Sequence, residues 1–389
     1  MLERYSFHGL QQNDDLSEIE YAGIKSAVGQ VNDLLNDWSS YVDRNGLDPR
    51  LFHTQNEWAG IISVSQSREL RYRDDFQWVN YIRLLSPFTG FYLPFLDRIG
   101  GAQLFGNEVT ERIQAEIAHG IRENIVELMD TLDPHERLAH VIDEQHRLTA
   151  NIPSKFVVKM PLRGGEVGLM IDGAIVNPDT IYTQGRINSM YNFGILRAIE
   201  ENIEKCGKCR VLEIGGGYGA LARALHSLFP GKLEYVMMDL PESLWSAAGY
   251  MTGTGPTDVL EPGQAFPDTF ETLMIANYLA EECRTSLGPV DLAINTMSFI
   301  EMSEAQVRYY RDLIGEVLAE DGRCFIEGIP SKPEHVDCNA LFAETMPARF
   351  RLLSRPAYTG EAGSTMWRKK KKTMPEWEIV RQLRDLRRW

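Results

Sequence analysis

Arg210-Val-Leu-Glu-Ile-Gly-Gly-Gly-Tyr-Gly219 is the most informative stretch of the 389-residue chain, because a short apolar run leads directly into a cluster of glycines. In residues 220–229, which follow, apolar side chains recur at the three- and four-residue spacing of a helix. The stretch therefore predicts a strand, a tight turn and a helix. Glycines let the backbone of such a turn approach a ligand, and the start of the helix offers unpaired N–H groups.

Glu213 lies inside this predicted strand, two residues before the first glycine. A carboxylate near the end of an otherwise buried parallel strand is costly unless it meets a partner. In open α/β sheets, ligands bind at the carboxyl ends of the strands. The strand, the turn and the carboxylate together favour a small polar cofactor at this place.

The composition limits the classes of partner. The chain has a formal net charge of −15 with 43% hydrophobic residues, and nucleic acid is disfavoured because phosphates require a basic surface. The first eight residues lack the basic-then-apolar pattern of a signal peptide, and no apolar run approaches the length of a membrane helix. These features predict a cytoplasmic protein that contacts neither nucleic acid nor membrane.

The five cysteines are an odd number in a long chain, which favours reduced thiols. Cys206-Gly-Lys-Cys209 is a C-x-x-C motif, but the sequence has no second pair to complete a zinc site. No metal site is predicted.

Residues 1–150 are predicted to form a mainly helical N-terminal domain. Apolar residues there recur at mixed threes and fours in four segments: Ile19–Tyr41, Leu70–Leu85, Glu108–Leu132 and His135–Leu148. The apolar faces of these helices fit a homodimer contact, the walls of an acceptor pocket or plain core equally well. Residues 151–180 are predicted to be a linker with a β-hairpin, in which strands Lys155–Met160 and Val167–Ile171 flank the turn 163–165.

Residues 181–389 alternate between strand and helix patterns, which predicts a doubly wound mixed α/β sheet of about seven strands. Gly253–Pro267 and Thr296–Met302 are predicted to be loops. The predicted strands are Arg210–Ile214, Leu233–Asp239, Thr272–Ala276, Val290–Asn295, Arg323–Glu327, Phe350–Leu353 and Ser364–Lys370.

Two cofactors bind to glycine-rich turns in this architecture. Gly215, Gly217 and Ala220 satisfy the dinucleotide pattern G-x-G-x-x-A, and Asp239 lies at a suitable distance for a ribose hydroxyl. An NAD(P)-dependent oxidoreductase therefore remains an alternative on these residues alone.

Two features favour S-adenosylmethionine over a dinucleotide. Glu213 would repel a pyrophosphate, whereas it is a suitable counter-charge for the ammonium and sulfonium groups of S-adenosylmethionine. Gly219 comes four residues after Gly215, as in the E-x-G-x-G-x-G pattern of methyltransferases.

Three segments resemble the motifs of class I S-adenosylmethionine-dependent methyltransferases: Val211-Leu-Glu-Ile-Gly-Gly-Gly-Tyr-Gly219, Met238-Asp-Leu-Pro241 and Asp291-Leu-Ala-Ile-Asn-Thr-Met-Ser-Phe-Ile-Glu-Met302. Together they are most similar to the bacterial sugar O-methyltransferase family, over roughly residues 180–370. The resemblance implies a Rossmann-like methyltransferase fold that binds S-adenosylmethionine. It also implies an acceptor hydroxyl on a sugar or a glycosylated small molecule.

The resemblance also assigns cofactor contacts to individual residues. Asp239 would accept hydrogen bonds from both ribose hydroxyls, a task that suits a carboxylate at a strand end. The methionine end would lie against Glu213 and the turn of Gly215, Gly217 and Gly219, and Tyr218 within this turn would also contact the cofactor. The adenine would be bordered by Leu240, Asn277 and Tyr278, and the methyl group would point towards Asn295 and Thr296.

Methyl transfer is an in-line displacement, so the enzyme must align the acceptor oxygen with the methyl group, and a sugar hydroxyl benefits from a base. Glu301 is the first candidate for this base, although a favourable interaction with the following helix dipole explains its position equally well. His335 is the second candidate, against the simpler explanation of a solvated loop histidine. A non-catalytic protein that only binds the cofactor is a further alternative.

Overall fold

The computed structural model describes residues 7–8, 17–53, 134–160, 168–253 and 255–328, the short stretches 336–338, 340–342 and 344, and residues 350–354 and 364–369. The predicted helices Leu70–Leu85 and Glu108–Leu132 and the predicted turn 163–165 lie outside the described residues.

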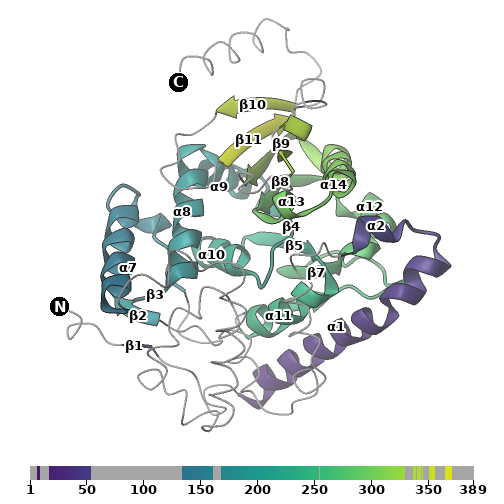
Figure 1. Cartoon of the computed structure of the whole chain (residues 1–389), viewed down its shortest axis with the longest axis horizontal. Helices are drawn as coiled ribbons and strands as arrows, with labels where there is room; N and C mark the ends of the chain where they lie inside the picture. The colour runs from purple at the N-terminus through teal and green to yellow at the C-terminus, as the bar shows by residue number, and fades with distance from the viewer. Residues whose placement is uncertain are drawn as a thin grey trace, which may run out of the picture.

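Eight of the described strands form one central sheet in the order β10-β11-β9-β8-β4-β5-β7-β6 (Figure 1). Strands β4 to β9 run parallel to one another, and β11 pairs antiparallel with both β9 and β10. The strands are β4 (Cys209–Ile214), β5 (Leu233–Asp239), β6 (Thr257–Val259), β7 (Thr272–Ala276), β8 (Val290–Thr296), β9 (Leu318–Glu327), β10 (Phe350–Ser354) and β11 (Ser364–Lys369).

This sheet confirms the predicted doubly wound α/β fold and adds one strand to it. The additional strand, β6, lies within Gly253–Pro267, which the glycine and proline content predicted to be loop throughout. That prediction is wrong for three residues, because Thr257–Val259 pair with the exposed edge of β7 and gain a ladder that the local sequence does not reveal.

The connections place a topological switch point between β4 and β8. From β4 the chain passes to β5 and β7 on one side, and it then crosses back to β8 on the other side. Right-handed crossovers place the helices after β4 and β5 on one face of the sheet and the helix after β8 on the opposite face. The described helices of this part are α8 (Pro178–Asn192), α9 (Ile195–Cys206), α10 (Ala220–Leu228), α11 (Pro241–Thr252), η5 (Asn277–Leu279), α12 (Ala280–Leu287), α13 (Ser298–Glu301) and α14 (Glu304–Val317).

The N-terminal helix α1 (Glu18–Arg44) packs lengthwise on α11, as Figure 1 shows. It begins with a capping box in which Ser17 and Glu20 satisfy each other's backbone N–H groups. Ile24, Val28 and Val31 recur at helical spacing and are buried in the same core as the sheet. The short helix α2 (Pro49–Phe52) then packs on α14.

A small sheet of β1 (Phe7–His8), β2 (Gly168–Ile171) and β3 (Ala174–Val176) lies beside helix α7 (Pro134–Thr149). The predicted hairpin had the wrong partners. Residues Ser154–Phe156 form a short 3₁₀ helix, so Lys155–Met160 is not a strand, and β2 pairs instead with β3. The reason is the two-residue turn Asp172-Gly173, whose φ angles of 50° and 77° match the twist of a hairpin.

None of the described helices combines the length and the apolar composition that crossing a membrane requires.

Candidate functional site

The glycine turn after β4 adopts a conformation that other residues resist. Gly215, Gly217 and Gly219 have φ angles of 73°, 58° and 96°, in the left-handed region. A Cβ atom on Gly215 would lie 1.9 Å from the hydroxyl oxygen of Ser298, and one on Gly219 would lie 2.8 Å from Met251. Backbone conformation and close packing therefore both require glycine at the first and last of these positions.

Asp239, the last residue of β5, is tied to this turn. Its Oδ2 accepts a hydrogen bond from the N–H of Gly217 at 2.7 Å, and its Oδ1 accepts one from the N–H of Leu240 at 2.7 Å. Burial raises the pKa of Asp239 to about 7, although these two N–H donors act in the opposite direction. The side chain of Ser243 also hydrogen-bonds this carboxylate, so ligand hydroxyls would use the remaining lone pair or take the place of Ser243.

Glu213 is 1% exposed and lies directly behind the turn, because a Cβ atom on Gly216 would be 2.8 Å from its Oε2. The same oxygen accepts a hydrogen bond from the Tyr235 hydroxyl at 2.7 Å. Burial raises the pKa of Glu213 to about 7, opposed by this hydrogen bond and by the charge of Arg186. The sequence predicted that this carboxylate needs a partner, and the fold supplies two from the chain itself.

The raised pKa of Glu213 predicts how stability depends on pH. The folded chain retains a proton that the unfolded chain releases, so the stabilisation from this residue is complete below its unfolded pKa and is lost as the pH rises through 7. Between pH 5 and pH 8, we expect the wild type to lose roughly 2 kcal/mol more unfolding free energy than Glu213→Gln. Urea titrations at a series of pH values measure this difference, and parallel pH curves for the two proteins would contradict it.

The end of β8 is braced against the glycine turn. The amide nitrogen of Asn295 donates to the backbone oxygen of Ile214 at 2.7 Å and to the Ser298 hydroxyl at 2.5 Å, and its oxygen accepts from the N–H of Phe299 at 3.1 Å. The side-chain amide of Asn295 thus holds the glycine turn to the end of β8, and Thr296 is buried beside it. The predicted loop Thr296–Met302 is wrong in part, because residues 298–301 form α13.

Helix α13 follows a residue with an unusual backbone. Met297 has a φ angle of 69°, which is rare for a residue with a side chain, and strained residues of this kind cluster at functional sites. Its N–H donates to the backbone oxygen of Glu327 at 2.7 Å. This bond fixes the short helix at the carboxyl edge of the sheet, next to the switch point.

The residues expected to border an adenine lie at two places. Leu240 is half-buried at the start of α11. Tyr218, which the sequence assigns to the cofactor as part of the glycine turn, packs edge-on nearby against Tyr250 of α11, with the ring centres 5.0 Å apart. Asn277 follows β7 and donates to the backbone oxygen of Phe52 at 3.3 Å. These contacts place Asn277 beside the N-terminal region.

Tyr278 is fully buried against α1, where its hydroxyl donates to the backbone oxygen of Leu34 at 3.0 Å. We expect Tyr278→Phe to lower the unfolding free energy by about 1 kcal/mol and to leave affinity for S-adenosylhomocysteine unchanged. Tyr41→Phe is the matched control, because it removes a hydroxyl that bonds Glu282 across the same interface. Weaker ligand binding by Tyr278→Phe alone would show that this hydroxyl serves the site.

Of the two candidate bases, Glu301 lies within the described residues and His335 does not. Glu301 is the last residue of α13 and is half-buried, two residues before Ser303, the N-cap of α14. His335 lies outside the described residues. Among the residues that the structure describes, no group of three or more histidine, cysteine, aspartate and glutamate side chains is arranged to hold a metal ion.

One ion pair at this edge of the sheet was not predicted from the sequence. Arg186 of α8 contacts Glu327, the last residue of β9, with 3.1 Å between Nε and Oε1. The charge of Glu213 also acts on Arg186. The signal in the sequence was the same as for Glu213, namely a carboxylate at the end of an apolar strand.

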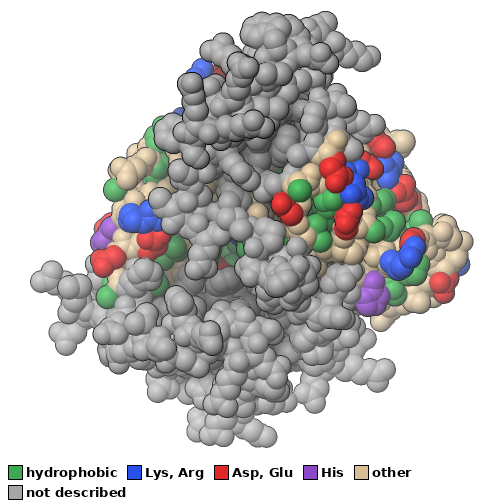
Figure 2. All heavy atoms as spheres, turned by 45° about the horizontal axis from the view of Figure 1, so that its top comes forward, with side chains coloured by type: hydrophobic (Ala, Val, Ile, Leu, Met, Phe, Trp, Pro, Cys, Tyr) green, Lys and Arg blue, Asp and Glu red, His purple; other side chains and the backbone are tan. Residues whose placement is uncertain are grey.

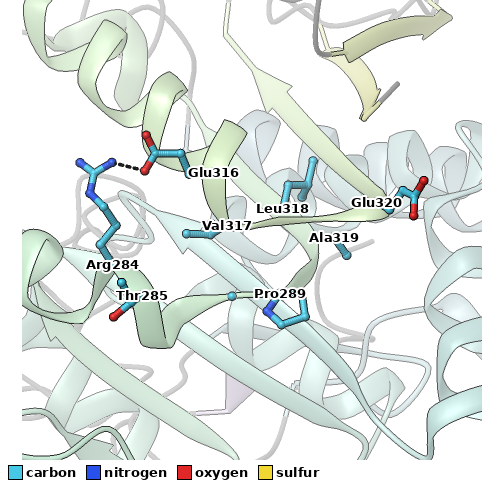
Figure 3. Close-up of a pocket in the computed structure, with 9 residues that line it drawn as sticks. Arg284, Thr285, Pro289, Glu316, Val317, Leu318, Ala319 and Glu320 are labelled. Carbon is cyan, nitrogen blue, oxygen red and sulfur yellow. Dashed lines mark hydrogen bonds and ion pairs between the residues drawn. The ribbon is translucent and has the colours of Figure 1, made fainter. Parts of the chain in front are cut away.

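A cavity of about 440 Å³ lies at the opposite edge, where β8 and β9 begin (Figure 3). Arg284 and Glu316 form an ion pair at its rim, with 2.6 Å between Nη1 and Oε2. The rest of its lining is the start of β9 together with Thr285, Gly288, Pro289 and Val317. This cavity is separate from the glycine turn.

Comparisons with known proteins find only weak structural similarity to solved structures. No model of a known protein family matches the sequence, and no curated protein matches it. Human methyltransferase-like protein 13, solved in complex with S-adenosylhomocysteine, is 19% identical over 50% of this chain and 90% of that chain, with a TM-score of 0.33.

Two further solved structures are similar to the same extent. Magnesium protoporphyrin IX methyltransferase from Synechocystis PCC 6803, with S-adenosylhomocysteine bound, is 9% identical over 49% of this chain and 88% of that chain, with a TM-score of 0.32. The ribosomal protein L11 methylase from Lactobacillus delbrueckii subsp. bulgaricus is 18% identical over 47% and 80%, with a TM-score of 0.31. Overlaps of this size carry no conclusion about activity or ligand.

The fold follows from the strand order and from the glycine turn after the first strand of the sheet domain. It is a doubly wound, Rossmann-like α/β fold, with β6 added at one edge.

Proposed function

We propose that the chain is an S-adenosylmethionine-dependent methyltransferase. The observation that carries the proposal is the pair of buried carboxylates around the glycine turn, with Glu213 behind it and Asp239 bonded to it. S-adenosylmethionine presents cationic ammonium and sulfonium groups, which suit the first carboxylate, and two ribose hydroxyls, which suit the second. The turn lies next to the switch point, where ligands bind in sheets of this kind.

The acceptor we propose is a hydroxyl group of a sugar or a glycosylated small molecule. The support for it is the sequence resemblance to bacterial sugar O-methyltransferases over the motifs that contain Gly215, Asp239 and Glu301. In this proposal Glu301 or His335 takes the proton of the acceptor hydroxyl as the methyl group leaves the sulfonium.

A dinucleotide-dependent oxidoreductase is the first rival. A pyrophosphate on the glycine turn would bring its negative charges close to the buried carboxylate of Glu213. Arg186, the cation whose charge acts on Glu213, is already paired with Glu327. This repulsion favours the cationic methyl donor.

Nucleic acid is a less suitable acceptor. The net charge is −15, and on the described part of the face in Figure 2 acidic and basic side chains are interspersed and form no basic patch. Arg308 is already paired with both Glu304 and Glu344. Phosphate binding depends on free cationic side chains.

Mass spectrometry tests the proposed activity. The protein is incubated with methyl-labelled S-adenosylmethionine and with a free hexose, a methyl hexoside or a nucleotide-linked hexose. The expected result is the gain of one labelled methyl group by one of these acceptors, together with release of S-adenosylhomocysteine. Binding of S-adenosylhomocysteine without any transfer would favour the non-catalytic alternative.

A further inference from the structure

One oxygen of Glu327 is buried without a hydrogen bond. The side chain is 4% exposed, and its Oε1 is held by the Nε of Arg186 at 3.1 Å. Its Oε2 has no hydrogen-bond partner among the described residues. A carboxylate oxygen that becomes buried loses its hydrogen bonds to water, which costs free energy unless a donor in the protein replaces them. A buried oxygen without a donor therefore requires an explanation.

Glu327 lies on the side of the switch point that the proposed cofactor leaves open. It is the last residue of β9, and its Cα is paired with that of Thr296 at the end of β8. Asp239 at the end of β5 and Asn277 after β7 lie on the other side of β4. A cofactor whose ribose is held by Asp239 would extend from β4 towards β7, so the ends of β8 and β9 lie on the side of β4 away from that ribose.

Arg186 fixes the direction of this carboxylate. The arginine is 18% exposed, and it comes from α8, while the charges of both Glu327 and Glu213 act on it. Because it binds only Oε1, it orients the side chain without occupying Oε2. A buried carboxylate that is held at one oxygen and open at the other is suited to accept a hydrogen bond from a neutral donor such as a hydroxyl group.

We propose that Glu327 is an acceptor-binding residue whose Oε2 accepts a hydrogen bond from a hydroxyl group of the methyl acceptor. Arg186 is the positioning residue that holds Oε1. The proposal rests on the proposed methyltransferase function and adds to it the residue that orients the acceptor. Holding the acceptor in line with the sulfonium methyl group is the main task of such an enzyme.

Glu327→Gln tests the proposal, because it keeps the shape of the side chain and removes its charge. Glu234→Gln is the matched control: Glu234 also forms a partly buried pair with an arginine, Arg210, at 2.8 Å, but at the amino end of β5. Three quantities are measured for both variants and the wild type: the melting temperature, the affinity for S-adenosylhomocysteine by calorimetry, and the kinetics with the hexose acceptors named above.

The expected result for Glu327→Gln is a KM for the acceptor raised at least about tenfold, as for the loss of one hydrogen bond to a charged group, with unchanged affinity for S-adenosylhomocysteine. Glu234→Gln should leave both quantities unchanged whatever its melting temperature. Arg186→Lys should raise the KM less than Glu327→Gln, since a lysine can still reach one oxygen.

Three results would overturn the inference: an unchanged KM in Glu327→Gln, an equal loss of affinity for S-adenosylhomocysteine, or a wild type that binds S-adenosylhomocysteine and methylates none of the hexoses. Failure of the proposed function itself is seen in the wild type alone, as no binding of S-adenosylhomocysteine or as binding without transfer, whereas the first two results are obtained with an active wild type.

Discussion

Replacing Asp239 by alanine is expected to weaken the binding of S-adenosylhomocysteine at least about 100-fold, because two hydrogen bonds to a charged group are lost together. The carboxylate is the group expected to hold the ribose hydroxyls. It also accepts the N–H of Gly217, so its removal leaves the middle of the glycine turn without its support. Asp239→Ala therefore loses both the contact with the ribose and the hydrogen bond that supports the turn.

The measurement is calorimetry at pH 8, where a carboxyl group with a pKa of about 7 is ionised. Asp239→Asn separates the two effects, since an amide oxygen still accepts one N–H but has no charge for the ribose. Asp258→Asn, at an exposed position on the edge strand β6, is the control and should bind like the wild type. Wild-type affinity in Asp239→Ala would exclude this carboxylate from the site.

Gly215→Ala is expected to lower the unfolding free energy by roughly 3 kcal/mol or more and to abolish ligand binding, because backbone strain and overpacking add. The φ angle of 73° is unfavourable for alanine. The new Cβ atom would also lie 1.9 Å from the Oγ and 2.5 Å from the Cβ of Ser298. Ser298 cannot move away freely, because Asn295 is bonded to its hydroxyl.

Gly231→Ala is the matched control for this substitution. Gly231 has a φ angle of 66°, and a Cβ atom there would meet no described atom within 4 Å. It should cost about 1–2 kcal/mol through backbone strain alone. Denaturant unfolding of both variants measures the difference, and the double variant Gly215→Ala, Ser298→Gly should recover part of it. Equal losses in the two single variants would show that the turn is not packed as described.

Much of the sheet could be predicted from local patterns. The bounds of β5 and β7 agree with the prediction, because both are apolar runs that end at polar or proline-containing turns. Strand β6 could not be predicted, since its three residues are a strand only through pairing with β7. The hairpin was predicted with the wrong partner, because Gly164-Gly165 and Asp172-Gly173 are both turn signals and only the second joins two strands that pair.

The geometry around the glycine turn could be predicted where it depends on chain order, and less well where it depends on packing. The glycine turn and Asp239 come together as expected, because adjacent parallel strands end at the same edge. The partners of Glu213 come from the neighbouring strand and from α8, and only the fold brings them close. Tyr278 follows Asn277 in sequence, but its hydroxyl is bonded to α1.

Titration of the wild type with S-adenosylhomocysteine and, separately, with NADH tests the central proposal most directly, because Asp239 alone would suit the ribose of either ligand. The account predicts saturable binding of S-adenosylhomocysteine and no binding of NADH, since Glu213 lies behind the turn that a pyrophosphate would occupy. Binding of NADH without binding of S-adenosylhomocysteine would contradict it.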